Sequence, residues 1–189
     1  MRKWIPVAAA LAVGLVSGTA NAALEPFQSF VGNYGVSSDG IGVQSGNGTI
    51  SAEIPAGSTI VAAYLYTATF STTATPATTQ DGVASTYGPR VGNDTACCSL
   101  ASHRANVTSV VQAAYDGLGG IYDFGYNETA LNSNTDGSAL VVVYENASLP
   151  TSTVGILDGW ASVTGDTASI NFSEPLDPTA AGFFAEMRL

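Results

Sequence analysis

Positive charge is scarce in this chain. Lys and Arg account for five of the 189 residues, whereas Asp and Glu account for 15, and the formal net charge is −10. Beyond residue 22 the basic residues are Arg90, Arg104 and Arg188. Such a chain repels phosphate backbones and anionic lipid headgroups, and it has few cations with which to neutralise them. We therefore expect no nucleic-acid partner and no binding to membrane surfaces.

Histidine is almost absent as well. His103 is the sole histidine, and neither the G-x-S-x-G nor the H-E-x-x-H pattern occurs. Ser99, Ser102 and Asp94 lie near His103 in the sequence, but catalytic triads are assembled by the fold and not by sequence proximity. We therefore interpret His103 as structural and predict no catalytic residue. The 15 carboxylates leave open a pair suited to glycoside hydrolysis, although no motif marks one.

Cysteine occurs only as the adjacent pair Cys97 and Cys98. Neighbouring Cα atoms lie about 3.8 Å apart, below the usual disulfide range of about 4.4–6.8 Å. Three states remain open: a strained vicinal disulfide, two free thiols, or bridges to cysteines outside residues 1–189. A zinc or iron–sulfur site would need further ligands of matching spacing. The pair also lacks the spacing of a C-x-x-C motif, so we expect no redox catalysis.

The N-terminus has the three parts of a cleavable bacterial-type signal peptide. Arg2 and Lys3 form a short positive region, residues 4–16 are almost all apolar, and residues 19–22 supply a small-residue A-x-A cleavage pattern. The apolar run is shorter than the roughly 20 residues that span a bilayer. We predict cleavage after Ala22, a single secreted or cell-surface domain over residues 23–189, and no membrane insertion after cleavage.

The sequence after residue 22 predicts short strands separated by Gly and Pro turns. Residues 49–54 alternate apolar with polar side chains, as in a half-buried strand, and the turn Pro55-Ala56-Gly57 ends them. Both faces of residues 58–70 are largely apolar, which favours a central strand covered on each side. The clearest strand is 138–145. Further strands are expected at residues 99–105, 121–126, 153–163, 168–172 and 182–189.

One short helix interrupts the strands. Asn106 is its candidate N-cap. Apolar residues then recur at helical spacing, at Val107, Val110, Val111, Ala114 and Tyr115. Residues 71–86 are expected to form a Thr- and Ala-rich loop, and Asp136-Gly137 a turn. Because no βαβ rhythm, repeat or heptad occurs, the predicted fold class is all-β: a two-sheet β-sandwich of jelly-roll type with one short helix.

Aromatic residues are candidates for a sugar-binding platform. Tyr64 and Tyr66 share one face of an expected strand, and Tyr122 and Tyr126 share a face of another. Trp160, which follows an Asp-Gly turn, is a further candidate. If exposed, such rings can stack on sugars; if buried, they fill the sandwich core, and their spacing of two residues favours the core.

A partial calcium-loop pattern precedes one strand. Asn132, Asn134 and Asp136 stand at alternate positions before Gly137, and alternate oxygen side chains of this kind can surround a Ca²⁺ ion. The pattern normally begins with Asp and has Glu at its twelfth position, where this chain has Val143. A polar turn without metal is the simpler interpretation, and no other cofactor is expected.

Three segments resemble a pattern in bacterial secreted surface proteins: residues 136–145 (DGSALVVVYE), 154–166 (VGILDGWASVTGD) and 104–111 (RANVTSVV). Together they are similar to the paired strands and upstream helix of many PEP-CTERM-type proteins. Those proteins are exported and then sorted to the envelope or extracellular matrix by a C-terminal tag. The resemblance implies a surface or matrix location and brings no catalytic residues. Residues 1–189 contain no such tag, so the chain is either a fragment or a freely released relative.

These features favour a non-enzymatic, secreted or surface-displayed β-sandwich that helps to build or bind the extracellular matrix. Its expected partners are extracellular polysaccharide or other surface proteins. A carbohydrate-binding module is the alternative, and a polysaccharide-active enzyme comes third. The third would need a cleft that holds two carboxyl groups about 5–10 Å apart.

Overall fold

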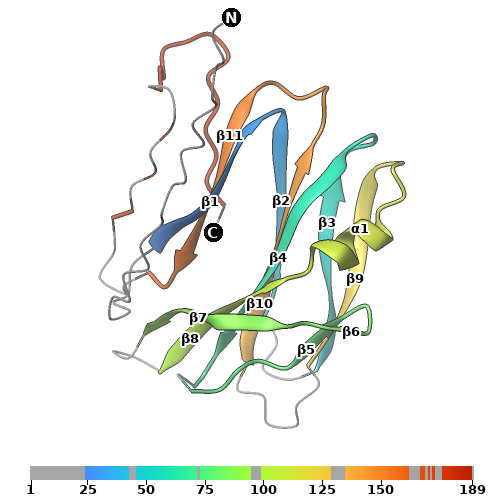
Figure 1. The fold of residues 1–189 in the computed structure, drawn as a ribbon, viewed down its shortest axis with the longest axis vertical. Helices are drawn as coiled ribbons and strands as arrows, with labels where there is room; N and C mark the ends of the chain where they lie inside the picture. Colours follow the sequence, from blue (N-terminus) through green and yellow to red (C-terminus); the bar gives the residue numbers. More distant parts are fainter. Residues whose placement is uncertain are drawn as a thin grey trace, which may run out of the picture.

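The computed structural model describes residues 24–42, 46–71, 73–94, 99–128, 135–161, 167–168, 170, 172 and 176–188. The expected signal peptide and the Cys97–Cys98 pair lie outside this part of the chain. The described residues form strands and one short helix, which confirms the all-β class (Figure 1). These elements are β1 (Leu24–Gly32), β2 (Tyr34–Ile41), β3 (Asn47–Ile54), β4 (Thr59–Thr69), β5 (Thr78–Gln80), β6 (Val83–Ala84), β7 (Tyr87–Asp94), β8 (Leu100–Asn106), α1 (Thr108–Ala114), β9 (Gly120–Glu128), β10 (Thr135–Glu145) and β11 (Ser152–Gly159).

The strands form three antiparallel sheets. A five-stranded sheet of order β2-β10-β4-β8-β7 lies between a four-stranded sheet of order β3-β9-β5-β6 and a two-stranded sheet of β1 and β11 (Figure 1). The sandwich therefore has a third sheet beyond the two expected from the sequence, because β1 pairs with β11 and not with the other strands. The jelly-roll type stays a prediction. In the described part of the chain, no helix is long and apolar enough to cross a membrane.

The central strands β4 and β10 bury side chains on both faces, as their sequences predict. On one face Leu65 of β4 lies opposite Leu140 of β10, and both belong to the main core against β3 and β9. On the other face Tyr64 and Val143 belong to a smaller core against β1 and β11. Because the period of a strand is two, adjacent residues of β4 and β10 serve different cores.

The helix α1 closes one end of the main core. Val107 and Val111 are buried there, and Val110 and Tyr115 pack against them. The N-cap position is Val107 and not Asn106 as the sequence predicted. Asn106 still acts at this end, because its side-chain oxygen accepts a hydrogen bond of 3.0 Å from the Thr108 N–H. The helix therefore begins one residue later than expected but uses the expected side chain.

Two segments that the sequence assigned to a loop and a turn are strands. Residues 71–86 include β5 and β6, and β5 is held by pairing with β9, so tertiary contacts override its polar sequence. Asp136-Gly137 lies inside β10, at an irregularity in its pairing with β4. A Cβ atom at Gly137 would lie 2.7 Å from the Ile41 carbonyl oxygen, so this glycine permits close approach of β2 and does not form a turn.

In the C-terminal part, by contrast, segments that the sequence predicts as strands lie outside strands. β11 ends at Gly159, whose φ of 136° is a glycine conformation, and not at residue 163. Residues 183–188 belong to no strand, and 168, 170 and 172 lie outside strands as well. Phe184 and Met187 are 78% and 79% exposed. The apolar residues of this segment therefore find no strand partner within the described chain.

We predict that Leu140→Ala lowers the free energy of unfolding by about 2–5 kcal/mol, because the Leu140 side chain is fully buried in the main core. Ala139→Ser, at the exposed neighbouring position, is the matched control and should change it by less than about 0.5 kcal/mol. Urea unfolding of both variants measures the difference. Equal effects of the two substitutions would contradict this placement of β10.

Candidate functional site

Arg104 joins the central sheet to the β1–β11 sheet. It lies on β8 directly opposite Tyr66 of β4, so both side chains are on the face toward β11. Arg104 forms an ion pair with Asp158 of β11, and the Tyr66 hydroxyl donates a hydrogen bond of 2.5 Å to the same carboxylate. The Arg104 and Asp158 side chains are 23% and 13% exposed. One carboxylate thus holds two side chains of the central sheet.

Aromatic side chains enclose the other side of the Arg104 guanidinium group. Its central carbon lies 3.4 Å from the centre of the Phe27 ring and 5.8 Å from that of Tyr64. The Phe27 and Tyr64 rings meet edge to face at 5.3 Å, and the Tyr64 hydroxyl donates a hydrogen bond of 2.5 Å to Gln28. Arg104 therefore contacts both strands of the two-stranded sheet, through cation–π stacking on β1 and charge pairing on β11.

Burial keeps the tyrosine hydroxyl of this network protonated. Loss of solvent raises the pKa of Tyr66 to about 12, although the nearby positive charge of Arg104 acts in the opposite direction. At neutral pH Tyr66 is therefore a hydrogen-bond donor to Asp158 and not a general base. The arrangement is suited to holding layers together, because the Asp158 carboxylate of one sheet interacts with both Arg104 and Tyr66 of the other.

The main core becomes polar at the end that faces β5. Here the Thr67 hydroxyl shares hydrogen bonds of 2.6 Å with Tyr87 and with Ser138. Ser138 donates to the Tyr126 hydroxyl at 2.9 Å, and Tyr87 also bonds Thr78 at 2.8 Å. These bonds connect the five-stranded sheet to β5 and β9. The two main sheets are therefore held by apolar contacts near α1 and by hydroxyl groups at the opposite end.

His103 and Gln80 are the unusual residues of this polar end. Gln80 is fully buried, and neither its amide oxygen nor its amide nitrogen has a hydrogen-bond partner among the described residues. His103 is 5% exposed, and neither ring nitrogen forms a hydrogen bond of normal geometry there. Burial lowers the pKa of His103, the positive charge of Arg90 lowers it further, and a backbone interaction with Ala74 opposes both. The sequence interpretation of His103 as a core residue agrees with its burial.

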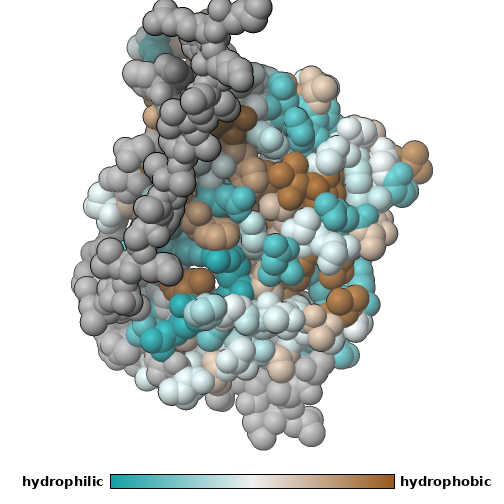
Figure 2. Space-filling model, viewed as in Figure 1, coloured by the Kyte–Doolittle hydropathy of each residue, from teal (hydrophilic) through white to brown (hydrophobic). Residues whose placement is uncertain are grey.

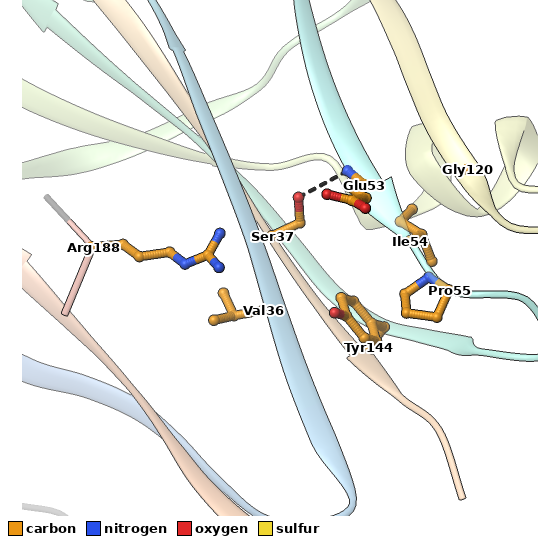
Figure 3. Close-up of a pocket in the computed structure, with 8 residues that line it drawn as sticks. All are labelled: Val36, Ser37, Glu53, Ile54, Pro55, Gly120, Tyr144 and Arg188. Atoms are coloured by element: carbon orange, nitrogen blue, oxygen red, sulfur yellow. Dashed lines mark hydrogen bonds between the residues drawn. The ribbon is translucent and has the colours of Figure 1, made fainter. Parts of the chain in front are cut away.

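A cavity of about 380 Å³ lies at the edge of the sandwich, between β2, β3 and β10 (Figure 3). Its polar lining groups are Ser37, Glu53, Tyr144 and Arg188, and its apolar surface comes from Val36, Ile54 and Pro55. In Figure 3 the Arg188 guanidinium group points toward Ser37 and Glu53 from the opposite side of the cavity. The positive charge of Arg188 and the negative charge of Glu53 therefore face the same cavity.

Local contacts hold this cavity in shape. The Glu53 N–H donates a hydrogen bond of 2.9 Å to the Ser37 hydroxyl oxygen, which ties β3 to β2. Arg188 is held by its own segment, because its Nε atom lies 2.8 Å from a Glu186 carboxylate oxygen. The pKa of Tyr144 is raised, mainly by burial, with Arg188 lowering it and Glu53 raising it.

The aromatic residues singled out in the sequence are mostly packing residues. Tyr126 and Tyr64 are 1% and 7% exposed, so neither presents an open ring face. Tyr66 is half-buried and bonded to Asp158. The Tyr122 hydroxyl is bonded to Asp116. The proposed sugar platform of paired tyrosines is therefore not formed in this structure, and Trp160 is half-buried at the end of β11.

The calcium candidate is only partly described. Asp136 is half-buried in β10, whereas Asn132 and Asn134 lie outside the described residues. Elsewhere in the described chain, no group of three or more His, Cys, Asp or Glu side chains is placed to hold a metal ion. The calcium loop and the state of Cys97 and Cys98 stay predictions.

Sequence patterns do not point to the cavity. Glu53, Tyr144 and Arg188 are far apart in the sequence and share no motif, and only folding brings them together. Comparison with known proteins gives no further guide: no protein-family model, curated protein or solved structure matches this chain. The function must therefore be argued from the site itself.

We predict that Arg104→Ala lowers the free energy of unfolding by about 2–4 kcal/mol, because Asp158 loses its partner in a largely buried position. Arg104→Lys should recover only part of this loss. A planar guanidinium group can pair with a carboxylate and stack on a ring at the same time, and an ammonium group cannot. A double-mutant cycle with Asp158→Ala should give a coupling of at least about 1 kcal/mol. The control is Glu25→Gln, which removes an exposed carboxylate opposite Asp158. Additive effects of the two single substitutions would contradict a direct pair.

Stability should also depend on His103 at mildly acidic pH. Because its pKa is lower in the folded chain than in the unfolded chain, the unfolded state binds more protons below about pH 6.5. Above that pH, neutral His103 should not lower the free energy of unfolding. As the pH drops from about 6.5 toward 5, the free energy of unfolding should fall. His103→Gln should flatten this slope, and no other histidine contributes. An equal slope in both proteins between pH 5 and 7 would exclude His103 as its source.

Proposed function

We propose that this chain is an exported, non-enzymatic β-sandwich protein of the bacterial cell surface or extracellular matrix. The observation that carries the proposal is the use of Arg104, Asp158 and Tyr66 as a clamp between sheets. These charged and hydroxyl groups of the β1–β11 interface bind one another, so they serve stability and are not available to a substrate. The signal-like N-terminus and the resemblance of residues 104–172 to PEP-CTERM-type proteins support the same proposal.

The surface of the molecule fits a role outside the cell. The chain is strongly acidic, with a formal net charge of −10, which favours solubility. On the face shown in Figure 2, hydrophobic residues form separate patches divided by hydrophilic ones. Contact with a matrix would therefore depend on polar recognition at a defined site more than on one large apolar face.

A carbohydrate-binding role is the second candidate, and a specific observation favours it. The cavity lined by Glu53, Arg188 and Tyr144 combines hydrogen-bonding groups with apolar surface. A second depression, of about 390 Å³, lies beside Tyr66 and is lined mainly by small residues without a charged group. The cavity at the β2–β3 edge is therefore the better candidate for recognition of a polar ligand.

The matrix proposal is tested by producing the full chain in a bacterium with a surface matrix and separating cells, matrix and medium. We expect the protein outside the cells, with an N-terminus at Ala23, and enriched in the matrix fraction. The control replaces Ala20 and Ala22 with Asp, which destroys the cleavage pattern. Cytoplasmic retention of the unchanged chain would refute export, and release of reducing ends from matrix polysaccharide by the purified protein would refute the non-enzymatic part.

A further inference from the structure

The cavity at the β2–β3 edge has the size and composition of a small-ligand site. Its volume of about 380 Å³ falls in the range of about 300–1,000 Å³ that is usual for such sites. Three of its polar groups lie on strands, since Ser37 belongs to β2, Glu53 to β3 and Tyr144 to β10, whereas Arg188 comes from the C-terminal segment outside the strands. Groups on paired strands are held in fixed positions, which favours recognition of a ligand of defined shape.

The polar groups of the cavity offer both hydrogen-bond donors and acceptors. The Glu53 carboxylate accepts, the terminal nitrogens of Arg188 donate, and the Tyr144 hydroxyl can do either. Ser37 is the acceptor in its bond with the Glu53 N–H, so its own O–H proton is not used in that bond. Pro55 and Ile54 supply apolar surface beside these groups. A sugar unit has the matching pattern, because hydroxyl groups surround its edge and C–H groups cover its faces.

Charge selects the class of sugar. Glu53 and Arg188 bring one negative and one positive charge to the same cavity, and Glu186, which pairs with Arg188, adds a second negative charge beside it. The rest of the chain is strongly acidic and repels polyanions. A neutral sugar therefore fits this site better than a uronate or a sulfated sugar.

Gly35 sets the position of the Tyr144 ring. The two residues are direct partners on β2 and β10, and the ring lies across the glycine backbone. A Cβ atom at Gly35 would lie 2.5 Å from Cε2 of Tyr144 and 2.8 Å from its hydroxyl oxygen, so any side chain there must displace the ring. Gly35 is thus a positioning residue for Tyr144 and contacts no ligand through a side chain of its own.

We propose that this cavity binds a neutral sugar unit of an extracellular polysaccharide, with Tyr144 against the sugar and with Glu53 and Arg188 bonded to its hydroxyl groups. The inference rests on the proposed matrix function and names the ligand of that function. This site differs from the tyrosine pairs predicted from the sequence, because none of those tyrosines lines the cavity.

The test measures binding of the exported full chain to a panel of polysaccharides by affinity electrophoresis and calorimetry. Laminarin, dextran, galactan and mannan are the neutral probes, and alginate is the acidic one. We expect binding to at least one neutral probe and none to alginate. Tyr144→Ala and Glu53→Gln should each weaken binding about tenfold or more. Binding to no neutral probe, or stronger binding to alginate, would overturn the proposal.

Matched variants separate recognition from folding. Tyr144→Phe keeps the ring and should keep most of the binding, whereas Gly35→Ala should weaken it as Tyr144→Ala does. Glu145→Gln removes an exposed carboxylate next to Tyr144 and outside the cavity lining, so it should leave affinity unchanged. Urea unfolding confirms that each variant is folded. Neutral-sugar binding that is unchanged in both folded Glu53→Gln and folded Gly35→Ala would place the sugar elsewhere and overturn this site.

Failure of this inference can be told apart from failure of the matrix function. If Tyr144→Ala protein stays in the matrix fraction as the unchanged protein does, the sugar site is wrong and matrix association stands. If the unchanged protein binds neutral sugars but is absent from the matrix fraction, the sugar site stands and the matrix function is wrong.

Discussion

The guanidinium group of Arg104 connects the two-stranded sheet to the rest of the molecule, because it pairs with Asp158 of β11 and stacks on Phe27 of β1. A two-stranded sheet has little stability by itself and needs a packed face. The core beneath it is small, with Phe30, Tyr64, Val143 and Ile156 among its buried residues. In such a small core, one charged side chain that reaches both strands supplies a large share of the specificity. It also fixes which face of β1 and β11 turns toward the central sheet.

Different interactions hold the two ends of the main core together. Near α1 its contacts are apolar and tolerate only well-fitting side chains, as at Leu65 and Val111. Near β5 the same two sheets meet through hydroxyl groups, because Ser138 bonds Tyr126 of β9 and Tyr87 bonds Thr78 of β5. The directional bond between Thr78 and Tyr87 helps to hold the short strand β5 in place, where hydrophobic contact would specify its position weakly. The polar end therefore compensates for a strand whose own sequence favours a loop.

Physical reasons separate what the sequence predicts from what only the fold reveals. The central strands are predictable because their apolar residues continue on both faces, and the helix because its valines recur at helical spacing. β1 and β2 are not, since residues 24–41 carry no apolar alternation and are paired with partners between 97 and 135 residues away. The cavity is not predictable either, because only the tertiary fold brings Glu53, Tyr144 and Arg188 together. The sequence predicts that Tyr126 shares a face of its strand with Tyr122, but the burial of Tyr126 depends on the opposing sheet.

The pairing of β1 with β11 has a consequence for how the chain folds. Leu24 lies opposite Gly159, so the first and last strands of the described chain form one sheet. Contacts of such long sequence separation form slowly, because the intervening chain must be ordered first. The Arg104 clamp cannot close until β8 and β11 are both in place, since it joins Arg104 to Asp158. Until then the Tyr64 and Val143 face of the central sheet is uncovered, which is the surface most exposed to aggregation. The pairing of the first and last described strands therefore makes covering this face a late step of folding.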